Sequence, residues 1–403
     1  MPFRNAWVPV GALLVFIGLV ASKPLVVAVG LVIVVLGAIG QLWSRHLFDR
    51  VTVVRRLGER RAFAGEHVSL GFSLENRKLL PLPWYELRLG IAEALPVDEE
   101  AVSGAAFPGL NFIVRRGALG WYQRHEWQVS IAPGERGFHQ VGPHTIRSAD
   151  LLGAFPRTIE DTSLEHLIVF PRVYPLSELG LPAERPFGDR RGRNRIFEDP
   201  LRIAGLREYR AGDPMRRIDW KATARTGDLQ SRVYEPSATQ QLYIMVNIDT
   251  MLHVWEGYLH DNLERTLSAA ASIAVWAAGA RYAVGLLANG AFPNADRPIR
   301  LAPSRSTDQL TRVLEALAVI QPLSMGDLAS AILREQGRLP AGSTIVVVAS
   351  LVPTELAAAM GRLAEEGHSV FLVGTAPEVA STVPPGIAFH DVSRELMRLE
   401  AVT

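Results

Sequence analysis

Two long stretches without a charged side chain stand near the start of the chain and constrain its fold more than any other feature. Residues 5–22 carry no charge, residues 24–44 carry none, and Lys23 alone lies between them. A helix needs about 20 apolar residues to cross a bilayer. The two stretches therefore predict a transmembrane hairpin over residues 1–48, with helices about 6–22 and 24–44.

The cations around these stretches predict the orientation of the hairpin. The connection offers Lys23 alone, whereas the outer side offers Arg4 and six arginines between residues 45 and 61. Because positively charged flanks stay in the cytoplasm, we expect a multi-pass protein of the cell membrane with both termini and the main body cytoplasmic. A cleaved signal ending near Ser22, or a pair of buried core helices, is a rival interpretation that two adjacent uncharged stretches disfavour.

The overall composition excludes several classes of protein. The 403 residues suffice for two or three domains, and 48% hydrophobic against 21% charged residues exclude a mainly disordered chain. The 42 cations and 41 anions give a net charge of +1, so we expect no nucleic-acid partner. Cysteine is absent, which excludes disulfide frameworks, thiolate zinc sites and cysteine nucleophiles.

A hydrophobic period of two follows over residues 49–180. Stretches such as 67–74, 84–89 and 127–131 alternate apolar and polar side chains, and turns rich in Pro, Gly and Asn separate them. Short alternating strands at near-regular spacing predict an antiparallel β-sandwich.

Residues 181–236 are interpreted as a basic linker followed by a signature segment. The linker places five arginines among prolines and glycines: Arg185, Arg190, Arg191, Arg193 and Arg195. Basic runs bind nucleic acid or lipid headgroups in some proteins. No aromatic side chains alternate with the cations here, so we interpret the stretch as a solvated linker.

From residue 237 to residue 403, strands alternate with helices. We expect strands at 242–249, 282–288, 343–349 and 369–374, and helices at 258–279, 306–320, 324–336 and 353–367. Such alternation predicts a doubly wound α/β domain with a parallel sheet. The whole chain is thus expected to be a multi-domain α+β protein.

The densest motif of the chain is Gly205-Leu-Arg-Glu-Tyr-Arg-Ala-Gly-Asp-Pro-Met-Arg-Arg-Ile-Asp-Trp-Lys221. Asp213 followed by Pro214 is typical of a helix start, so we expect a helix to begin there. On that helix three cations would share one face and repel each other: Arg217, Lys221 and Arg225. An acid of the chain or a bound phosphate would offset that repulsion. The acids that could do so are Asp199, Asp219 and Glu235.

This run resembles the signature of the bacterial family called domain of unknown function 58. The matching residues are Arg207, Tyr209, Gly212, Asp213, Arg216, Asp219, Trp220 and Lys221. The apolar N-terminus and segments 63–66, 76–84 and 136–143 are similar to that family as well. The resemblance implies a membrane-anchored protein with a von Willebrand factor A-like C-terminal domain, acting as a chaperone-like or assembly module beside a MoxR-type AAA+ ATPase. It implies no catalytic residue.

A von Willebrand A-like domain raises the question of a magnesium site after its first strand. Intact sites carry Asp-x-Ser-x-Ser, whose oxygens meet the octahedral demand of Mg²⁺. Here Asp249 is present, but Met251 and His253 replace both serines, and Ser350 stands where a further Asp is common. We therefore expect a degenerate site without metal, in which Asp249 is structural or lies at the surface.

The sequence contains no other catalytic constellation. A phosphate-binding loop, a Gly-x-Ser-x-Gly motif and metal-spaced histidines are absent. We expect a membrane-anchored, non-enzymatic adaptor without a cofactor, whose signature residues contact partners: the membrane, a MoxR-type AAA+ ATPase and other proteins.

Two alternatives stay open. One is a metal-dependent von Willebrand A-type protein-binding module, and the other is an enzyme with an unrecognised site around residues 207–221. Lys221 attracts attention because it is one of only three lysines in an arginine-rich chain. Packing of its aliphatic stem against Trp220 is the plainer explanation.

Overall fold

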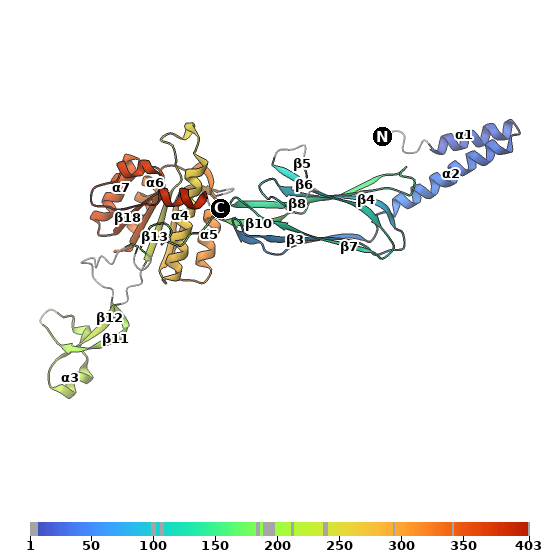
Figure 1. Ribbon diagram of the computed structural model, residues 1–403. Coiled ribbons are helices and arrows are strands. Elements are labelled where there is room, and N and C mark those ends of the chain that lie inside the picture. The colour runs from blue at the N-terminus through green and yellow to red at the C-terminus, as the bar shows by residue number, and fades with distance from the viewer. Residues whose placement is uncertain are drawn as a thin grey trace. The chain divides into compact units, whose positions relative to one another are not determined.

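The structure is a computed structural model, and its mixed α+β class is the one expected (Figure 1). The described residues are 7–97, 102–104, 109–182, 186–187, 198–210, 213–236, 241–292, 295–340 and 342–401. The chain divides into two units, Met1–Phe170 and Pro171–Thr403, and each is described by itself. The arginines expected to form the basic linker lie outside the described residues.

Two apolar helices open the first unit: α1, Trp7–Val20, and α2, Pro24–Arg45. Pro24 occupies the first turn of α2, where its missing N–H costs nothing. With 22 residues, α2 is long and apolar enough to cross a membrane. The 14 described residues of α1 are fewer than a crossing needs. The spanning of a bilayer by the pair stays a prediction.

Small residues bring α1 and α2 close together, and large apolar residues point away. A Cβ atom on Gly30 would lie 2.7 Å from the backbone nitrogen of Val15, so the two backbones nearly touch. Phe16 and Leu25 are 64% and 78% exposed. This arrangement, small inside and large outside, is typical of helix pairs in membranes.

Two sheets with a shared core follow in the first unit. The smaller sheet has the order β1-β3-β7, and the larger has the order β2-β10-β8-β4-β6-β5, with β9 on β8. The strands are β1 Val51–Leu57, β2 Arg61–Phe63, β3 Val68–Asn76, β4 Leu82–Ala92, β5 Val102–Gly104, β6 Leu110–Leu119, β7 Arg124–Ile131, β8 Gly137–Ser148, β9 Arg157–Asp161 and β10 Glu165–Phe170. The expected antiparallel pairing holds except between β2 and β10, which are parallel.

Alternate residues of both sheets meet in one hydrophobic core. Leu70 and Leu74 of β3 pack in the same cluster as Leu87 and Leu89 of β4, and all four are at most 1% exposed. The period of two therefore places one face of each sheet inside. Leu47, just after α2, belongs to the same core.

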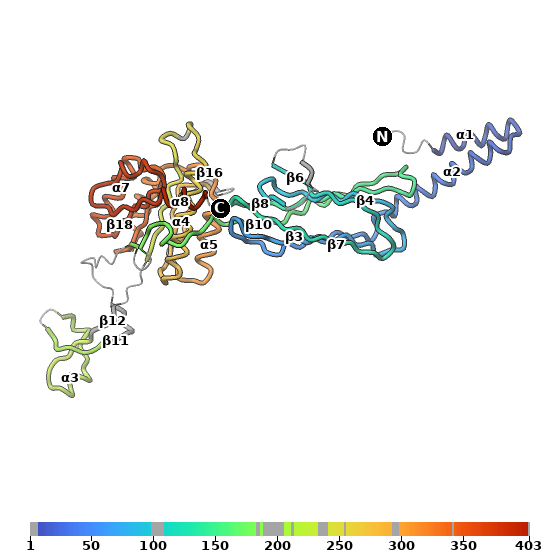
Figure 2. Tube along the Cα trace, in the orientation of Figure 1, coloured from blue at the N-terminus to red at the C-terminus, as the bar shows by residue number. Residues whose placement is uncertain are grey.

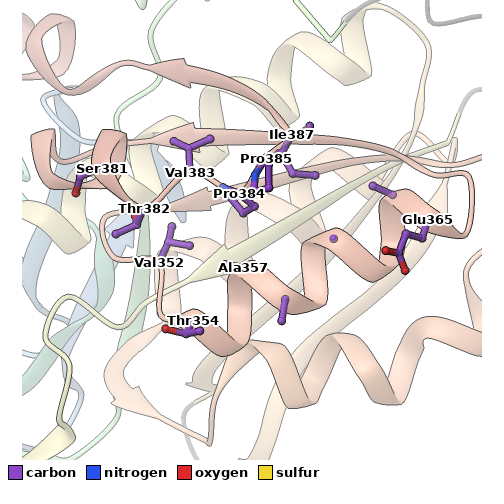
Figure 3. A pocket seen from close by; sticks show the side chains of 14 residues that line it. Val352, Thr354, Ala357, Glu365, Ser381, Thr382, Val383, Pro384, Pro385 and Ile387 are labelled. Atoms are coloured by element: carbon purple, nitrogen blue, oxygen red, sulfur yellow. The ribbon is translucent and has the colours of Figure 1, made fainter.

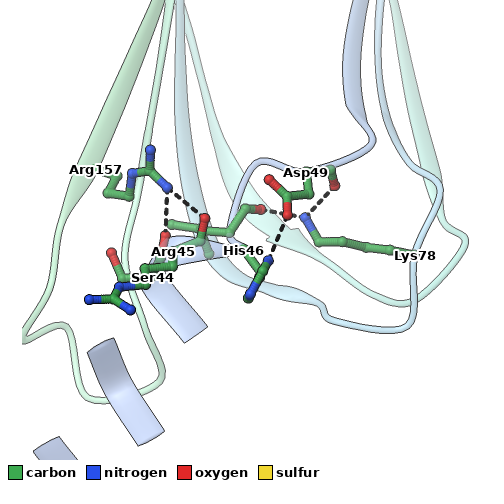
Figure 4. A network of polar contacts seen from close by, with 7 residues as sticks. Ser44, Arg45, His46, Asp49, Lys78 and Arg157 are labelled. Atoms are coloured by element: carbon green, nitrogen blue, oxygen red, sulfur yellow. Dashed lines mark hydrogen bonds and ion pairs between the residues drawn. The ribbon is translucent and has the colours of Figure 1, made fainter. Parts of the chain in front are cut away.

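Two cations hold the end of α2 against the strands (Figure 4). Arg157 Nη1 donates to the carbonyls of Ser44 and Arg45 at 2.9 and 2.8 Å. Lys78 Nζ donates to the carbonyls of Leu47 and Asp49 at 2.5 and 2.7 Å. The bonds from Arg157 reach the last carbonyls of α2, which lack intrahelical donors, and the bonds from Lys78 hold the turn that follows the helix.

A hairpin of two strands begins the described part of the second unit after residue 187. β11, Glu198–Glu208, pairs antiparallel with β12, Gln230–Pro236. The connection between them contains the short 3-10 helix η1, Met215–Arg217, and the helix α3, Trp220–Thr226. We call residues 205–232 the signature lobe.

The rest of the second unit is built on a sheet with the order β15-β14-β13-β17-β18-β19, to which β16 adds on β14. Figure 2 labels β16 and β18 of this sheet. The strands are β13 Gln241–Asn247, β14 Ala283–Phe292, β15 Ala295–Ser304, β16 Gln321–Ser324, β17 Thr344–Ala349, β18 Ser369–Gly374 and β19 Ala388–Asp391. Neighbouring strands in the series β14, β13, β17, β18 and β19 pair in parallel, as predicted. The sheet also contains two strands that were not expected, β15 and β16, which pair antiparallel with β14.

Helices cover both faces of this sheet (Figure 1). They are α4 His260–Gly279, α5 Gln309–Val319, α6 Leu328–Glu335, α7 Thr354–Glu365 and α8 Ser393–Glu400, with the 3-10 turns η2 Val254–Glu256, η3 Gln336–Arg338 and η4 Pro377–Ser381. α6 and α7 pack on one face, against a core that includes Met245 and Val347. The Ala-rich α4 packs elsewhere on the sheet and is buried along most of its length.

Candidate functional site

The structure gathers the signature residues in the signature lobe. Seven of the eight lie among the described residues, and Gly212 lies outside them. Arg207 Nη2 donates to Asp213 Oδ1 at 2.7 Å, and the backbone N–H of Arg210 donates to Asp213 Oδ2 at 3.0 Å. The Arg207 guanidinium holds the pKa of Asp213 below its ordinary value. This ion pair closes the loop that leaves β11.

A second carboxylate organises the other half of the lobe. Asp219 accepts from the backbone N–H groups of Lys221 and Ala222 at 3.1 and 3.0 Å, and its Oδ2 accepts from Arg232 Nε at 3.0 Å. The bonds to Ala222 and Arg232 lower the pKa of Asp219. Asp219 therefore caps α3 and ties it to β12.

The predicted helix start at Asp213 is wrong. The Asp213 carboxylate accepts hydrogen bonds from the Arg207 guanidinium and the backbone N–H of Arg210. The chain then makes only the single turn η1 before it becomes extended at Ile218. Ile218 is 4% exposed and bridges to Ser231 of β12, which interrupts any helix at that point. The expected cationic stripe is thus divided, with Arg217 in η1 and the other two cations in α3.

Two large apolar side chains of the lobe are exposed, although Ile218 is buried, and Asp213 and Asp219 are held by hydrogen bonds within the lobe. Met215 is 66% exposed and Trp220 is 62% exposed. Tyr209 is half-buried and its backbone N–H donates to the carbonyl of Leu229. Arg216 and Lys221 are exposed. The lobe thus presents a methionine and a tryptophan on a scaffold fixed by two ion pairs.

A second polar cluster lies where β13 and β14 end. Asn289 Nδ2 donates to Asp249 Oδ2 at 2.8 Å, and Asn289 Oδ1 accepts from the backbone N–H of Ile248 at 2.9 Å. Burial raises the pKa of Asp249, against the opposing effect of bonds from Ser324 and Asn289. Asp249 therefore joins the loop after β13 to β14 and β16, which agrees with a structural role.

Two residues that follow Asp249 make other contacts here, and one of them, His253, is at a position that ligates metal in intact von Willebrand A sites. Thr250 Oγ1 accepts from the backbone N–H of Leu259 at 2.8 Å. The ring of His253 stacks on Trp255, with centroids 4.3 Å apart. Among the described residues, no group of three or more His, Asp or Glu side chains is placed to hold a metal ion. The donor set at Asp249 does not fit Mg²⁺.

Sequence reasoning missed an apolar loop at the same edge of the sheet. Residues 251–259, which we call the edge loop, expose four large apolar side chains: Leu252 at 71%, Trp255 at 82%, Tyr258 at 46% and Leu259 at 46%. The signal is an apolar run between a strand and a helix, but in the sequence Met251 and His253 of this run stand out only as replaced metal ligands, and the helix is expected to begin at Tyr258. Asn289 was missed because a single amide inside a strand has no distinctive pattern.

The groove beside α7 offers little chemistry (Figure 3). Small residues of α7, such as Ala357, line one side, and residues 381–387 line the other. Glu365 is its single titratable lining residue among the described residues. No pair of groups there can exchange a proton with a substrate.

The signature lobe, the polar cluster and the strands from β13 to β18 lie inside one matched region of sequence. Residues 205–385 match the family model described as "Protein of unknown function DUF58". The DUF58 match includes every described signature residue and Asp249.

A curated relative supports the DUF58 match. The chain is 26% identical over 226 residues to "Uncharacterized protein YeaD" of Bacillus subtilis (strain 168), which covers 54% of this chain. The chain spans about half, 51%, of the length of that relative.

Solved structures with similar parts are only distantly alike. A cohesin module from a Clostridium perfringens family 33 glycoside hydrolase is 12% identical with a TM-score of 0.23, covering 30% of this chain and 96% of that one. The sporulation control protein Spo0M of Bacillus subtilis is 14% identical with a TM-score of 0.19, covering 32% and 53%. Such low scores carry no argument about fold or function.

Proposed function

We propose that the protein is a membrane-anchored, non-enzymatic adaptor that binds a protein partner through Met215 and Trp220 of its signature lobe. We infer that the partner is a MoxR-type AAA+ ATPase and that the α/β part of the second unit is von Willebrand A-like. In this proposal the hairpin spans the cell membrane twice, with both termini and the main body cytoplasmic.

The exposure of Met215 and Trp220 is the observation that carries this proposal. Ordinary proteins expose single large apolar residues, but tryptophan is strongly enriched among residues that dominate binding energies. Asp219 immediately precedes Trp220 and fixes the first turn of α3, so the indole is held on an ordered turn. Preorganisation of that kind lowers the entropic cost of association.

The polar residues of the lobe support binding over catalysis. Arg207 and Asp213 pair with each other, and Asp219 pairs with Arg232, so their charges stabilise the lobe. A catalytic acid or base needs a pKa matched to its task, whereas both aspartates have pKa values lowered by their partners. The alternatives of an enzyme and of a metal-dependent module gain no specific support from this geometry.

The anchor part of the proposal rests on the surface of α1 and α2. Large apolar side chains are exposed along both helices, for example Phe16 at 64% and Leu31 at 57%. A bilayer is the solvent in which such a surface is stable.

Co-purification from native membranes tests the proposal. Full-length protein is extracted with and without ATP, and AAA+ proteins in the eluate are quantified. We expect the double variant Met215→Ala/Trp220→Ala to lose roughly tenfold or more of the captured ATPase, as expected when a tryptophan hot spot is truncated. Trp255→Ala, which removes an exposed tryptophan from the edge loop, is the matched control and should retain it.

Two outcomes would contradict the proposal. If the unaltered chain captures no AAA+ protein either with or without ATP, a MoxR-type ATPase is not its partner. Loss of capture in Trp255→Ala with retention in the double variant would move the binding site from the signature lobe to the edge loop. The Lys221→Arg variant should bind fully if that lysine serves only as a solvated cation.

A further inference from the structure

Strand register places three loops of the first unit at the same end as α2. Val51, the first residue of β1, pairs with Asn76, the last of β3, so the β3–β4 loop lies beside the end of α2. Leu119, the last residue of β6, pairs with Leu82, the first of β4. Ser148, the last residue of β8, pairs with Tyr85. We call the connections 77–81, 120–123 and 149–156 the helix-end loops.

Hydrogen bonds join two of these loops to each other and to the chain that leaves α2. Asn76 Nδ2 donates to the carbonyls of Leu80 and Gly120 at 3.0 and 2.8 Å. The backbone N–H of Tyr122 donates to the carbonyl of Lys78. Because Lys78 Nζ also binds the carbonyls of Leu47 and Asp49, both loops are fixed to the α2–β1 connection (Figure 4).

The third loop packs along the helices themselves. The ring of Phe155 meets the ring of Trp7 edge-on, with centroids 6.2 Å apart. A Cβ atom on Gly40 would lie 2.9 Å from Phe155 and 3.1 Å from Asp150. Gly40 precedes the end of α2 by five residues, or about 7 Å of helix rise. The loop therefore lies beside the apolar part of α2, below the end of that helix.

The large apolar side chains with the highest exposure in the strand-bearing part of this unit all belong to the helix-end loops. Among the described residues between 48 and 170, those more than 60% exposed are Leu79 at 67%, Trp121 at 70%, Tyr122 at 67%, Leu151 at 66% and Leu152 at 69%. The remaining exposed large apolar residues of that part, such as Phe138, reach at most 45%. Highly exposed large apolar side chains are therefore concentrated in the helix-end loops and are not spread over the whole surface of this part.

The turn that carries Leu151 and Leu152 is built to present them. Asp150 is 2% exposed, and its carboxylate accepts from the backbone N–H groups of Phe155 at 2.6 Å and Leu152 at 3.2 Å. A buried carboxylate thus organises the turn from inside while two leucines point outward.

The charges of the same end suit a lipid surface. The helix-end loops and the residues that flank them, taken as 45–51, 75–82, 119–124 and 148–157, carry six cations against three acids. The cations are Arg45, Arg50, Arg77, Lys78, Arg124 and Arg157. Anionic headgroups attract basic segments near the bilayer, and Trp and Tyr concentrate at the membrane–water interface.

We propose that the helix-end loops form a membrane-docking surface, in which Leu79, Trp121, Tyr122, Leu151 and Leu152 enter the headgroup region of the bilayer that α2 crosses. The proposal rests on the proposed membrane anchor and adds that the strand-bearing part of the first unit lies directly on the lipid. Its continuity with α2 and its net positive charge identify the occupant as a lipid surface.

Single-cysteine labelling of the full chain tests this proposal, because the protein has no cysteine of its own. Leu151→Cys and Trp121→Cys each receive an environment-sensitive fluorophore, and the chain is reconstituted in vesicles of phosphatidylcholine and phosphatidylglycerol. Some vesicles contain lipid with a quencher near the headgroup. We expect both probes to lose at least about half of their fluorescence to that quencher, because interfacial residues lie within 5–10 Å of the headgroup boundary.

Two further labels separate this proposal from the anchor. Val35→Cys, on the exposed side of α2 and near its middle, reports whether the helices are inserted, and is measured in vesicles with a quencher deep in the acyl chains. Phe138→Cys, at the far end of β8, is measured with the headgroup quencher and reports non-specific contact. Quenching at Val35, Leu151 and Trp121 but not at Phe138 supports the proposal. Quenching at Val35 with both loop probes at the level of Phe138 overturns it and leaves the anchor intact.

The remaining outcomes overturn the proposal in other ways. Absence of quenching at all four labelled positions would contradict both the proposed anchor and the proposed docking surface. Equal quenching at Phe138 and at the loop probes shows that lipid contact is not specific to the helix-end loops. The variant Leu152→Glu, combined with the probe at Trp121, should reduce quenching by several fold, because a charge is introduced at the proposed lipid contact.

Discussion

Asp249 resembles a metal ligand in the sequence, but in the structure its carboxylate is hydrogen-bonded to Asn289 of β14. Its position after a buried strand is the one that metal-binding domains use, and Met251 and His253 stand where such domains carry serines. The amide that replaces them, Asn289, comes from 40 residues away. A contact at that separation depends on how β13 and β14 pair, so local pattern alone does not predict it.

The raised pKa of Asp249 gives a prediction with a definite sign. The folded state favours the protonated form, so the charged form weakens folding at every pH above the folded pKa. Asp249→Asn should therefore raise the melting temperature at pH 7, and the gain should fade as the pH falls through the folded pKa towards the unfolded value. Melting curves across that range, with exposed Asp228→Asn as control, check this. A lower melting temperature at pH 7 would show that the charge itself is needed.

Asp219 gives a second prediction at this scale. Asp219→Ala removes two capping bonds and the pair with Arg232, so α3 should lose about 1 kcal/mol of local stability. Hydrogen exchange at the amides of Lys221 and Ala222 should become several-fold faster. Asp228→Ala should leave exchange unchanged, and Asp219→Asn, which keeps an acceptor, should fall between. Equal exchange in Asp219→Ala and Asp228→Ala would mean that the cap does not hold the lobe.

The signature lobe also shows the limit of motif reading. The sequence predicted that these residues act together and that one aspartate begins a helix, but two aspartates fit the capping rule. Asp213 and Asp219 differ only in what they meet in three dimensions: Arg207 occupies the first, whereas the second faces free N–H groups and Arg232. The outcome depends on the β11–β12 pairing.

Among the elements, strands with regular alternation or with a continuous apolar run were predicted well, and strands interrupted by proline were not. β3, β4, β7, β13, β17 and β18 lie where the sequence placed strands. β15 was missed because Pro298 and Pro303 interrupt it, and proline argues against a strand unless that strand lies at an edge. β15 is indeed an edge strand, and it pairs with β14 through irregular register.

Close approach between β4 and β8 gives a prediction about elements. A Cβ atom on Gly90 would lie 2.8 Å from the backbone oxygen of Gly142, and backbone cannot move away as a side chain can. Gly90→Ala should destabilise the first unit by roughly 1–3 kcal/mol. Gly134→Ala, at a position with nothing within 4 Å, is the matched control and should change stability little. Chemical denaturation of both variants tests this prediction. Equal denaturation midpoints would show that the added methyl group at residue 90 causes no strain.

For the whole molecule, the anchor and the core meet at Leu47, which gives a further prediction. A chain that begins at Arg45 keeps Leu47, which is 0% exposed, and should leave the membrane pellet after an alkaline carbonate wash. A chain that begins at Val51 also loses Leu47 and should be about 2–5 kcal/mol less stable. Ultracentrifugation and denaturation test the two effects separately. Retention of the longer fragment in washed membranes would contradict α1 and α2 as the anchor.

The direction of β8 and β10 has a consequence for reach. β8 runs towards the end held by α2, and β10 runs antiparallel to it, so the first unit ends at Phe170 beside Gly137, the residue of β8 farthest from the helix. The 12 residues of β8 extend over ~40 Å. With the end of α2 clamped by Arg157 and Lys78, the strands act as a stiff spacer of fixed length. The last residue of the first unit therefore lies about one β8 length from the residues that follow α2.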